Sequence, residues 1–270
     1  MQPWLLVSPA SKGIGFCMAR HLLKTTNAPV VVTARNDLDG TKRKIMDGLS
    51  EVDDKRLKAL HLDFLDEKSI MEASKECKST FPIEDNLLHL AYVIPGILFP
   101  EKSPEKVDYE KALLTFQTNT LGPLMFTKHF FQFLPQKSIK MDASSEAWKG
   151  LDSKLARWIF MSARVGSVTD NKKGGWYSYR SSKSAINQIT KSFDLHVKTK
   201  SGDNAMAIAM HPGTVKTGLS KEFWDSVPKD RLLEPEDSAE RLIGLCTKSD
   251  GVGLDGRGRI WDWQGKEIEP

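Results

Sequence analysis

The stretch Ser8–Gly15, SPASKGIG, follows the apolar run Trp4–Val7 directly and opens an amphipathic stretch that continues to Thr25. A short apolar strand that turns through glycines into a helix is typical of the first unit of a dinucleotide-binding α/β fold. The glycines let the backbone approach a pyrophosphate, and the N–H groups that open the helix bind its charge. The residues of this loop that we expect to contact a dinucleotide are Ser8, Ser11, Lys12, Gly13, Ile14 and Gly15.

Pro9 stands in this loop where such loops usually open with a glycine. Proline has a fixed φ and no backbone N–H, so it removes one donor and stiffens the turn. Gly13 and Gly15, the two glycines nearest the expected phosphates, are present. We therefore expect the loop to bind its dinucleotide, with loss of binding as the alternative.

Short apolar runs and amphipathic stretches alternate along the rest of the chain. Near-continuous apolar strands between helices predict a parallel sheet, doubly wound, with helices on both faces. We expect one Rossmann-type α/β domain over residues 1–270 that binds the dinucleotide with its first half. The expected strands are Trp4–Val7, Val30–Ala34, Leu57–Leu62, Leu87–Tyr92, Arg157–Ser162, Ala205–His211 and Arg259–Trp263. The expected helices are Gly13–Thr25, Leu38–Ser50, Ser69–Thr80, Tyr109–Leu134, Tyr179–Lys198 and Pro235–Thr247.

One segment, Gln136–Lys154, is polar and shows no periodicity. We expect it to be a surface excursion before the fifth strand, with a partner-binding loop as the functional alternative.

The composition argues against several classes of protein. The net charge of +4 is spread along the chain in short clusters, which indicates a solvated surface and no nucleic-acid site. No apolar run approaches the roughly 20 residues that span a membrane. The N-terminus also lacks the basic region and following apolar segment of a secretion signal. The three cysteines fit neither metal-ligand spacing nor a disulfide framework. We expect a cytoplasmic protein that binds no metal, nucleic acid or membrane.

The end of the second strand, VVVTARN, indicates which dinucleotide is bound. NAD sites usually carry an acidic residue there for the ribose 2′-hydroxyl, but this chain has Ala34 followed by Arg35. A guanidinium suits a 2′-phosphate, and Lys12 offers a second cation. We infer NADP(H); the alternative is two surface cations. Asp63, which closes the third strand, either accepts from the adenine amino group or caps the next segment.

Tyr179 and Lys183 lie four residues apart in GGWYSYRSSKSAINQ, so on a helix they share a face. A free phenol, with a pKa near ~10, is a poor acid or base at neutral pH, and a neighbouring ammonium lowers that pKa. Tyr179 would then exchange a proton with a carbonyl oxygen, and Lys183 would also hold a cofactor ribose.

Together these motifs carry a family resemblance. The chain resembles the short-chain dehydrogenases/reductases over essentially its whole length, and within them the C-factor-like and sniffer-like carbonyl reductases. The motifs that carry it, in order, are SKGIG (11–15), LDFLD (62–66), TNTLGP (118–123), MSARVGS (161–167), GGWYSYRSSKSAINQ (174–188), HPGTVKTGL (211–219) and GRIWDWQGKEIEP (258–270).

The resemblance implies roles for the matching positions. Tyr179 is expected to be the catalytic acid/base, with Lys183 beside it. Asn119 matches the asparagine that kinks a long helix and holds a water of the proton relay. Pro212 and Gly213 would turn the chain after the sixth strand. Val215 would meet the nicotinamide carboxamide through its backbone, and Thr217 the cofactor's phosphates.

The chain departs from the family at three places. Besides Pro9, the segment Tyr92–Ile97, YVIPGI, stands where the family has Asn-Asn-Ala-Gly and keeps only its glycine. At the family's catalytic serine, three residues before Gly166, the chain has Ala163. Ser162 is our candidate replacement, brought round by a bulge, and Ser167 is the second candidate.

The region Thr214–Leu233 is expected to form the family's mobile substrate lid. Leu219, Phe223 and Trp224 make it apolar, and Trp176 offers a further wall of the site. Packing on the core or at a subunit interface is the alternative for these aromatic residues. The last strand, Arg259–Trp263, is a candidate for subunit pairing in a homodimer or homotetramer.

From the residues and the resemblance we expect an NADPH-dependent reductase of an apolar aldehyde or ketone. An NADP-dependent alcohol or steroid dehydrogenase and a non-catalytic dinucleotide-binding signalling protein stay open as alternatives.

Overall fold

The computed structural model describes all residues from 1 to 270. Its centre is an eight-stranded sheet in the order β10-β9-β6-β5-β4-β1-β2-β3. Every pairing is parallel except that of β10 with β9, so the predicted parallel, doubly wound sheet is confirmed with one antiparallel edge strand added. The strands are β1 (Gln2–Ser8), β2 (Val30–Ala34), β3 (Leu57–His61), β4 (Asn86–Val93), β5 (Ala156–Met161), β6 (Ala205–His211), β9 (Ile260–Asp262) and β10 (Glu267–Ile268).

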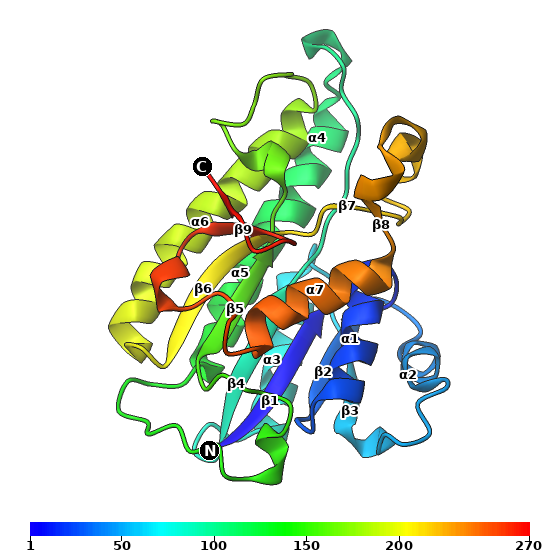
Figure 1. The fold of residues 1–270 in the computed structure, drawn as a ribbon. Coiled ribbons are helices and arrows are strands. Elements are labelled where there is room, and N and C mark those ends of the chain that lie inside the picture. The colour runs from blue at the N-terminus through cyan, green and yellow to red at the C-terminus, as the bar shows by residue number, and fades with distance from the viewer.

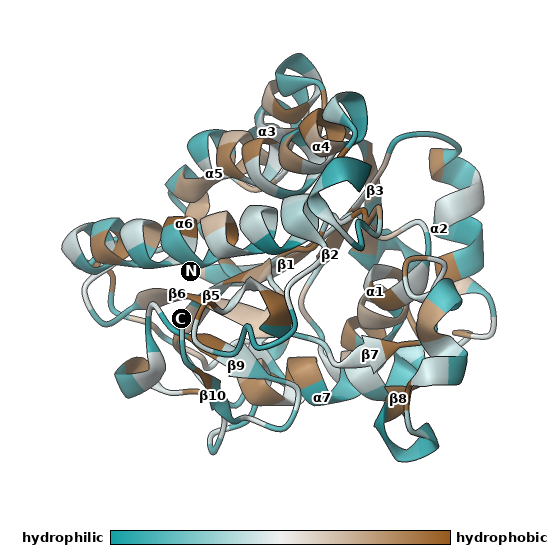
Figure 2. Cartoon of the chain, turned by 90° about the horizontal axis from the view of Figure 1, so that it is seen from above, coloured by the Kyte–Doolittle hydropathy of each residue, from teal (hydrophilic) through white to brown (hydrophobic).

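Helices cover both faces of this sheet (Figure 1). On one face lie α1 (Gly13–Thr25), α2 (Leu38–Met46) and α7 (Pro235–Thr247). On the other lie α3 (Glu67–Thr80), α5 (Gly122–Phe130) and α6 (Tyr177–Ser201), with α4 (Tyr109–Phe116) against α6. Figure 2 shows hydrophobic residues on the strands and on the inward sides of the helices.

The sheet has a hydrophobic core on each face, and alternate residues of β1 contribute to each of them. Leu5 and Val7 enter the core under α1 and α7, while Trp4 and Leu6 enter the core under α3, α5 and α6. Since successive side chains of a strand point to opposite faces, a fully apolar strand is buried on both sides. The order of the strands reverses between β1 and β4, and open α/β sheets bind ligands at the carboxyl ends of the strands at such a point.

The long helix expected over Tyr109–Leu134 is interrupted. A π-helical turn, Gln117–Leu121, separates α4 from α5. Pro123 has no N–H, so it cannot donate to the carbonyl of Asn119 four residues earlier, and the helical register changes there. The kink expected at Asn119 is therefore present, and it places the Asn119 side chain in the interior.

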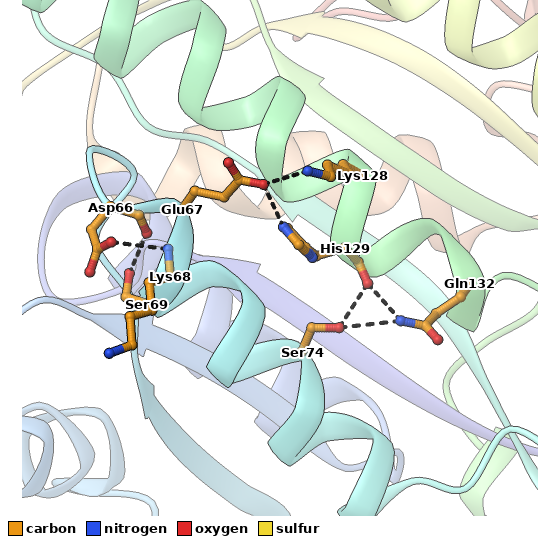
Figure 3. A network of polar contacts seen from close by, with 8 residues as sticks. All are labelled: Asp66, Glu67, Lys68, Ser69, Ser74, Lys128, His129 and Gln132. Carbon is orange, nitrogen blue, oxygen red and sulfur yellow. Dashed lines mark hydrogen bonds and ion pairs between the residues drawn. The ribbon is translucent and has the colours of Figure 1, made fainter.

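A polar network fixes α5 on α3 (Figure 3). Glu67 accepts hydrogen bonds from Lys128 at 2.7 Å and from His129 at 3.0 Å. Two turns further along α3, the Ser74 hydroxyl donates to the carbonyl of His129 at 2.7 Å. Since α5 begins directly after the π-helical turn, this network also fixes the position of Asn119.

The surface excursion expected at Gln136–Lys154 is partly wrong. Trp148 and Leu151 are buried in the core under α1 and α7, and the Trp148 indole donates to the carbonyl of Met1 at 3.2 Å. Its ring packs edge-on against His89, with 4.9 Å between the ring centroids. Two isolated apolar residues in a polar segment leave no periodicity, so the sequence did not reveal this contact.

Candidate active site

Tyr179 and Lys183 lie on the first turns of α6 and face the interior. Tyr179 is 8% exposed and Lys183 is 2% exposed, and the Lys183 Nζ lies 5.7 Å from the centroid of the tyrosine ring. The predicted pair on one helix face is therefore present. Burial raises the pKa of Tyr179 to about 12 and lowers the pKa of Lys183 to about 8. Burial thus outweighs the lowering of the phenol pKa that we expected from the neighbouring ammonium, and Tyr179 is protonated at neutral pH.

Asn119 joins this pair to the loop after β4. Its Oδ1 accepts from the Ile97 N–H at 2.9 Å, and its Nδ2 donates to the Ile97 carbonyl at 2.9 Å and to the Ser182 hydroxyl at 3.1 Å. Ser182 in turn donates to the carbonyl of Tyr179 at 2.7 Å. Both Nδ2 hydrogens bind protein atoms, so the expected water of a proton relay stays a prediction and would have to use other groups of Asn119.

The two candidate serines after β5 both use their hydroxyl groups in hydrogen bonds within the protein. Ser162 is 2% exposed and donates to Asn187 Oδ1 on α6 at 2.6 Å. The Ser167 hydroxyl accepts from the Asp170 N–H at 3.0 Å. Ala163, at the position of the family's serine, is nearly buried. The pairing of β5 with its neighbours is regular, so the bulge that would turn Ser162 is absent. A catalytic role of Ser162 stays a prediction.

The glycine loop keeps the shape of an anion cradle. Gly13 has a φ of +62°, and a Cβ on Gly15 would lie 2.1 Å from the carbonyl oxygen of Pro9, so only glycine fits there. The residue before α1, Lys12, makes no side-chain cap, and its extended backbone leaves the first N–H groups of the helix for a ligand. Ser11 and Lys12 are exposed, and Ile14 is half-buried. These residues fit a pyrophosphate.

Ser8 lies outside this cradle. It is fully buried, and its hydroxyl shares a 2.6 Å hydrogen bond with the Thr33 hydroxyl on β2. Its carbonyl accepts from the Ile94 N–H at 2.7 Å. The sequence motif includes Ser8, but the structure assigns its polar groups to the joining of three strands.

The two candidate residues for the adenosine end differ in their surroundings. Arg35 follows β2, is exposed and makes no contact with a carboxylate. The carboxylate of Asp63 accepts from the Leu65 N–H at 3.0 Å, so it caps the next turn, as the structural alternative proposed. One oxygen of Asp63 makes no hydrogen bond within the protein.

Ile94 and Gly96 of the unusual YVIPGI segment lie at the two ends of the site. The Ile94 side chain lies against Gly15, where a Cβ would be 2.9 Å from its Cδ1. A Cβ on Gly96 would be 3.9 Å from the Lys183 Nζ. Ile94, which departs from the family's sequence, thus packs against the glycine loop, and Gly96, which the chain keeps, lies beside Lys183.

The region expected to form the lid, Thr214–Leu233, follows the Pro212–Gly213 turn, where Gly213 has a φ of +84°. The ends of the lid pair with each other as β7 (Thr214–Val215) and β8 (Leu232–Leu233). The methyl group of Thr217 lies 3.5 Å from a Cβ placed on Gly13, so this residue faces the glycine loop. Figure 1 shows the lid projecting at the end of the sheet opposite the N-terminus.

Trp176 connects the lid to Tyr179. Its ring centroid lies 4.8 Å from that of Phe223 and 6.2 Å from that of Tyr179. The expected aromatic wall is therefore next to the phenol. Ser182, whose hydroxyl binds Asn119 and the carbonyl of Tyr179, was missed by the sequence reasoning, although its position three residues after Tyr179 was a usable signal.

The protein contains no group of His, Cys, Asp and Glu side chains arranged to hold a metal ion. None of its helices combines the length and apolar character that crossing a membrane requires.

Comparison with known proteins shows the family of the chain. Residues 3–227 match the family described as short chain dehydrogenase, and the chain belongs to that family of oxidoreductases. It is 29% identical over 162 residues to C-signal of Myxococcus xanthus, covering 60% of this chain and 80% of that protein.

Two solved structures share the fold at low identity. One is the NADPH-bound carbonyl reductase from chicken fatty liver, with a TM-score of 0.79 and 22% identity, covering 99% of this chain and 98% of that one. The other is the carbonyl reductase Sniffer of D. melanogaster, with a TM-score of 0.79 and 22% identity over 100% of both chains.

Proposed function

We propose that the protein is an NADPH-dependent carbonyl reductase that converts an aldehyde or ketone into an alcohol. The observation that carries this proposal is the buried pair of Tyr179 and Lys183 on one face of α6, beside Gly96 and below the lid. A pure binding protein has no need of a buried phenol and ammonium at the cofactor edge of the sheet.

NADP(H) is the cofactor that the residues favour. The cradle of Gly13 and Gly15 fits a pyrophosphate, while Lys12 and Arg35 offer two exposed cations for a 2′-phosphate. The structural neighbour from chicken fatty liver was solved with NADPH bound, which agrees with this choice.

When bound, NADPH supplies the hydride for the carbonyl carbon. Tyr179 donates its proton to the carbonyl oxygen, and the burial that raises its pKa keeps it in the protonated form that reduction requires. Lys183 keeps N–H donors for the ribose. Oxidation of an alcohol would need the phenolate, so the raised pKa favours reduction over the dehydrogenase alternative.

The substrate is a carbonyl compound with an apolar body. Trp176, Phe223 and Leu219 supply the apolar surface: the Trp176 ring lies beside those of Tyr179 and Phe223, and the Leu219 side chain lies beside Gly96. Lys216, at the base of the lid, is paired with Glu234.

A nucleotide titration tests the first half of the proposal. The purified protein is titrated with NADPH and with NADH, and nucleotide fluorescence is followed. We expect tight binding of NADPH and weak binding of NADH. Binding of neither would mean that Pro9 and Ile94 have closed the cradle, and the reductase proposal would be withdrawn.

Replacement of Tyr179 by Phe tests the second half. Because the ring is kept and only the proton donor is lost, we expect turnover of a probe aldehyde such as 4-nitrobenzaldehyde to fall by at least about 100-fold. The affinity for NADPH is expected to stay within about threefold. Full turnover by this variant would refute the proposed proton donor.

A non-catalytic dinucleotide-binding protein is the second candidate, favoured by Ala163 in the place of the family's serine. It predicts NADPH binding with no turnover of any carbonyl or alcohol, in either direction, by the unaltered protein.

A homodimer or homotetramer is part of the proposal. Exposed apolar residues follow the outer side of α4 and α5: Tyr109, Leu113, Leu121 and Leu124. Light scattering on the protein as it elutes from a size-exclusion column gives its mass directly. A monomer at all concentrations would refute the proposed oligomer.

A further inference from the structure

Glu101 is a buried carboxylate outside the residues assigned above. It is 3% exposed, and no Lys, Arg or His side chain lies within ion-pair distance. Both oxygens bind one residue, Ser178: Oε2 accepts from its N–H at 2.8 Å, and Oε1 accepts from its hydroxyl. A buried charge without a cation requires strong compensation, and here the N-terminus of α6 provides it.

Ser178 is the second residue of α6, so Glu101 caps this helix from a distant segment. The residue before the helix, Trp176, has no side chain that can cap, and its N–H donates to the Glu101 carbonyl at 2.6 Å. The capping that a local Ser or Asp usually provides is thus supplied across 77 positions of sequence.

The same contact holds an unusual backbone. Gly174, Gly175 and Trp176 are all left-handed, with φ values of +63°, +66° and +51°. For glycine this conformation is easily reached, but for tryptophan it is an outlier that persists only where the surroundings enforce it. The conformation aims the indole at Tyr179 and Phe223.

Glu101 also belongs to the loop that Asn119 holds. Ile97, four residues earlier, is the residue bound by both polar atoms of the Asn119 side chain. The connection from β4 to α4 is therefore tied at Ile97 to the π-helical turn and at Glu101 to α6, and it fixes the two elements relative to each other.

We propose that Glu101 is a positioning residue for Tyr179: its carboxylate caps α6 through Ser178 and thereby sets the orientation of Trp176 and of the phenol. The inference rests on the proposed role of Tyr179, but the structural effect does not require that role. Ser178, which Glu101 binds, directly precedes Tyr179, so loss of the cap moves the phenol relative to the lid.

Fluorine NMR tests the structural effect without any substrate. The chain has four tyrosines, so labelling with 3-fluorotyrosine gives four resonances, and Tyr179→Phe identifies one of them. We expect Glu101→Ala to shift or broaden the resonance of Tyr179, while that of Tyr92, buried in the core, stays in place. Glu101→Asp, which keeps the charge, is expected to restore part of the original position.

Two further variants keep the test decisive if Glu101→Ala folds poorly. Glu101→Gln has the same shape but one acceptor fewer, and we expect a smaller shift of the same resonance. Ser178→Ala removes the hydroxyl partner and leaves the N–H. Because both changes break one contact, their effects together are expected to be less than additive. Glu105→Ala is the matched control, since Glu105 is exposed in the same connection and its carboxylate accepts a hydrogen bond from Ser103 and not from α6.

Kinetics supply the functional arm. With 4-nitrobenzaldehyde as probe, we expect Glu101→Gln to lower kcat about 10-fold or more, with the Kd for NADPH within about threefold, because misplacement affects the proton transfer. An unmoved Tyr179 resonance in Glu101→Ala and Glu101→Gln would overturn the positioning role. Full turnover by Tyr179→Phe would instead overturn the proposed function, so the two failures are distinguishable.

Discussion

The ammonium of Lys183 donates a hydrogen bond of 2.8 Å to the carbonyl of Met161, the last residue of β5. This is the only hydrogen bond that the protein offers the ammonium, although it carries three donors. The end of β5 therefore fixes the direction of the lysine and leaves two donors of the ammonium without a partner in the protein, as the proposed contact with a cofactor ribose requires.

This arrangement predicts a pH limit for carbonyl reduction. Burial lowers the pKa of Lys183 to about 8, so its charge is present below that pH and is lost above it. Tyr179, with a pKa raised to about 12, stays protonated throughout. We expect kcat/KM to fall as the pH rises through about 8. Lys183→Arg, which stays charged, is expected to be slower but to lack this limb. A profile for the unaltered protein that stays flat to pH 10 would contradict the assignment.

Arg35 is predicted to discriminate between the two dinucleotides. Replacing Arg35 by Ala removes a charge-assisted contact to the 2′-phosphate, so we expect NADPH to bind about 10- to 100-fold more weakly and NADH to bind almost unchanged. Parallel titrations with both nucleotides measure this. Lys78→Ala, at the exposed end of α3, is the control for a general loss of positive charge. Equal weakening of both nucleotides would show that Arg35 does not contact the phosphate.

Substitutions at Ala163 and at Ser162 are predicted to have different effects, because Ala163 occupies the position of the family's catalytic serine and Ser162 does not. Ala163→Ser returns a donor to the family's position, and we expect kcat to rise about 10-fold because the developing charge on the carbonyl oxygen gains a hydrogen bond. Ser162→Ala breaks the bond to Asn187, and we expect a loss of about 1 kcal/mol in stability with little change in kcat. A loss of kcat beyond 100-fold in Ser162→Ala, at unchanged stability, would instead make Ser162 the catalytic hydroxyl.

His89 is predicted to weaken the fold in acid. It is fully buried, and burial together with Arg157 lowers its pKa to about 3, against about 6.5 in an unfolded chain. The unfolded state binds the proton first, so this contribution to stability is complete above pH 6.5 and decreases as the pH falls. The slope reaches about 1.4 kcal/mol per pH unit, or about 2 kcal/mol between pH 7 and pH 5. Urea unfolding of His89→Leu at both pH values is expected to show a smaller difference; the same difference as in the unaltered protein would refute the assignment.

The regular elements of the fold were predictable because their patterns are strong. The bounds of β2, β6, α1 and α7 agree with the prediction, since each is an uninterrupted apolar run or a helix with clear punctuation at its ends. The π-helical turn was not placed by periodicity, because Gln117–Leu121 has the composition of an ordinary helix. The short strand β10 was missed because two residues cannot show alternation, and the side chain of Asp262, which accepts from the Lys266 N–H at 3.0 Å, fixes its turn.

The site was predictable where its residues are close in sequence. Tyr179 and Lys183 were found from helical spacing, and the glycine loop from its place between a strand and a helix. Glu101 left no such pattern, because its partner Ser178 is 77 positions away and its own segment has no period. The pKa of Tyr179 was expected to fall and instead rises, since the depth of burial is a property of the packed chain and not of the spacing of two residues.

Because β7 pairs with β8, the lid is a segment that can be exchanged as a unit. Thr214 lies beside Leu232 and Val215 beside Leu233, so the segment leaves the body of the protein and returns to it at one point. Residues 218–231 can change in length or composition with little effect on the sheet, because loop closure costs only about 0.6 kcal/mol for each doubling of length. Under the proposed function, the range of compounds accepted can therefore diversify, in evolution or by grafting, while Tyr179 and Lys183 on α6 stay unchanged.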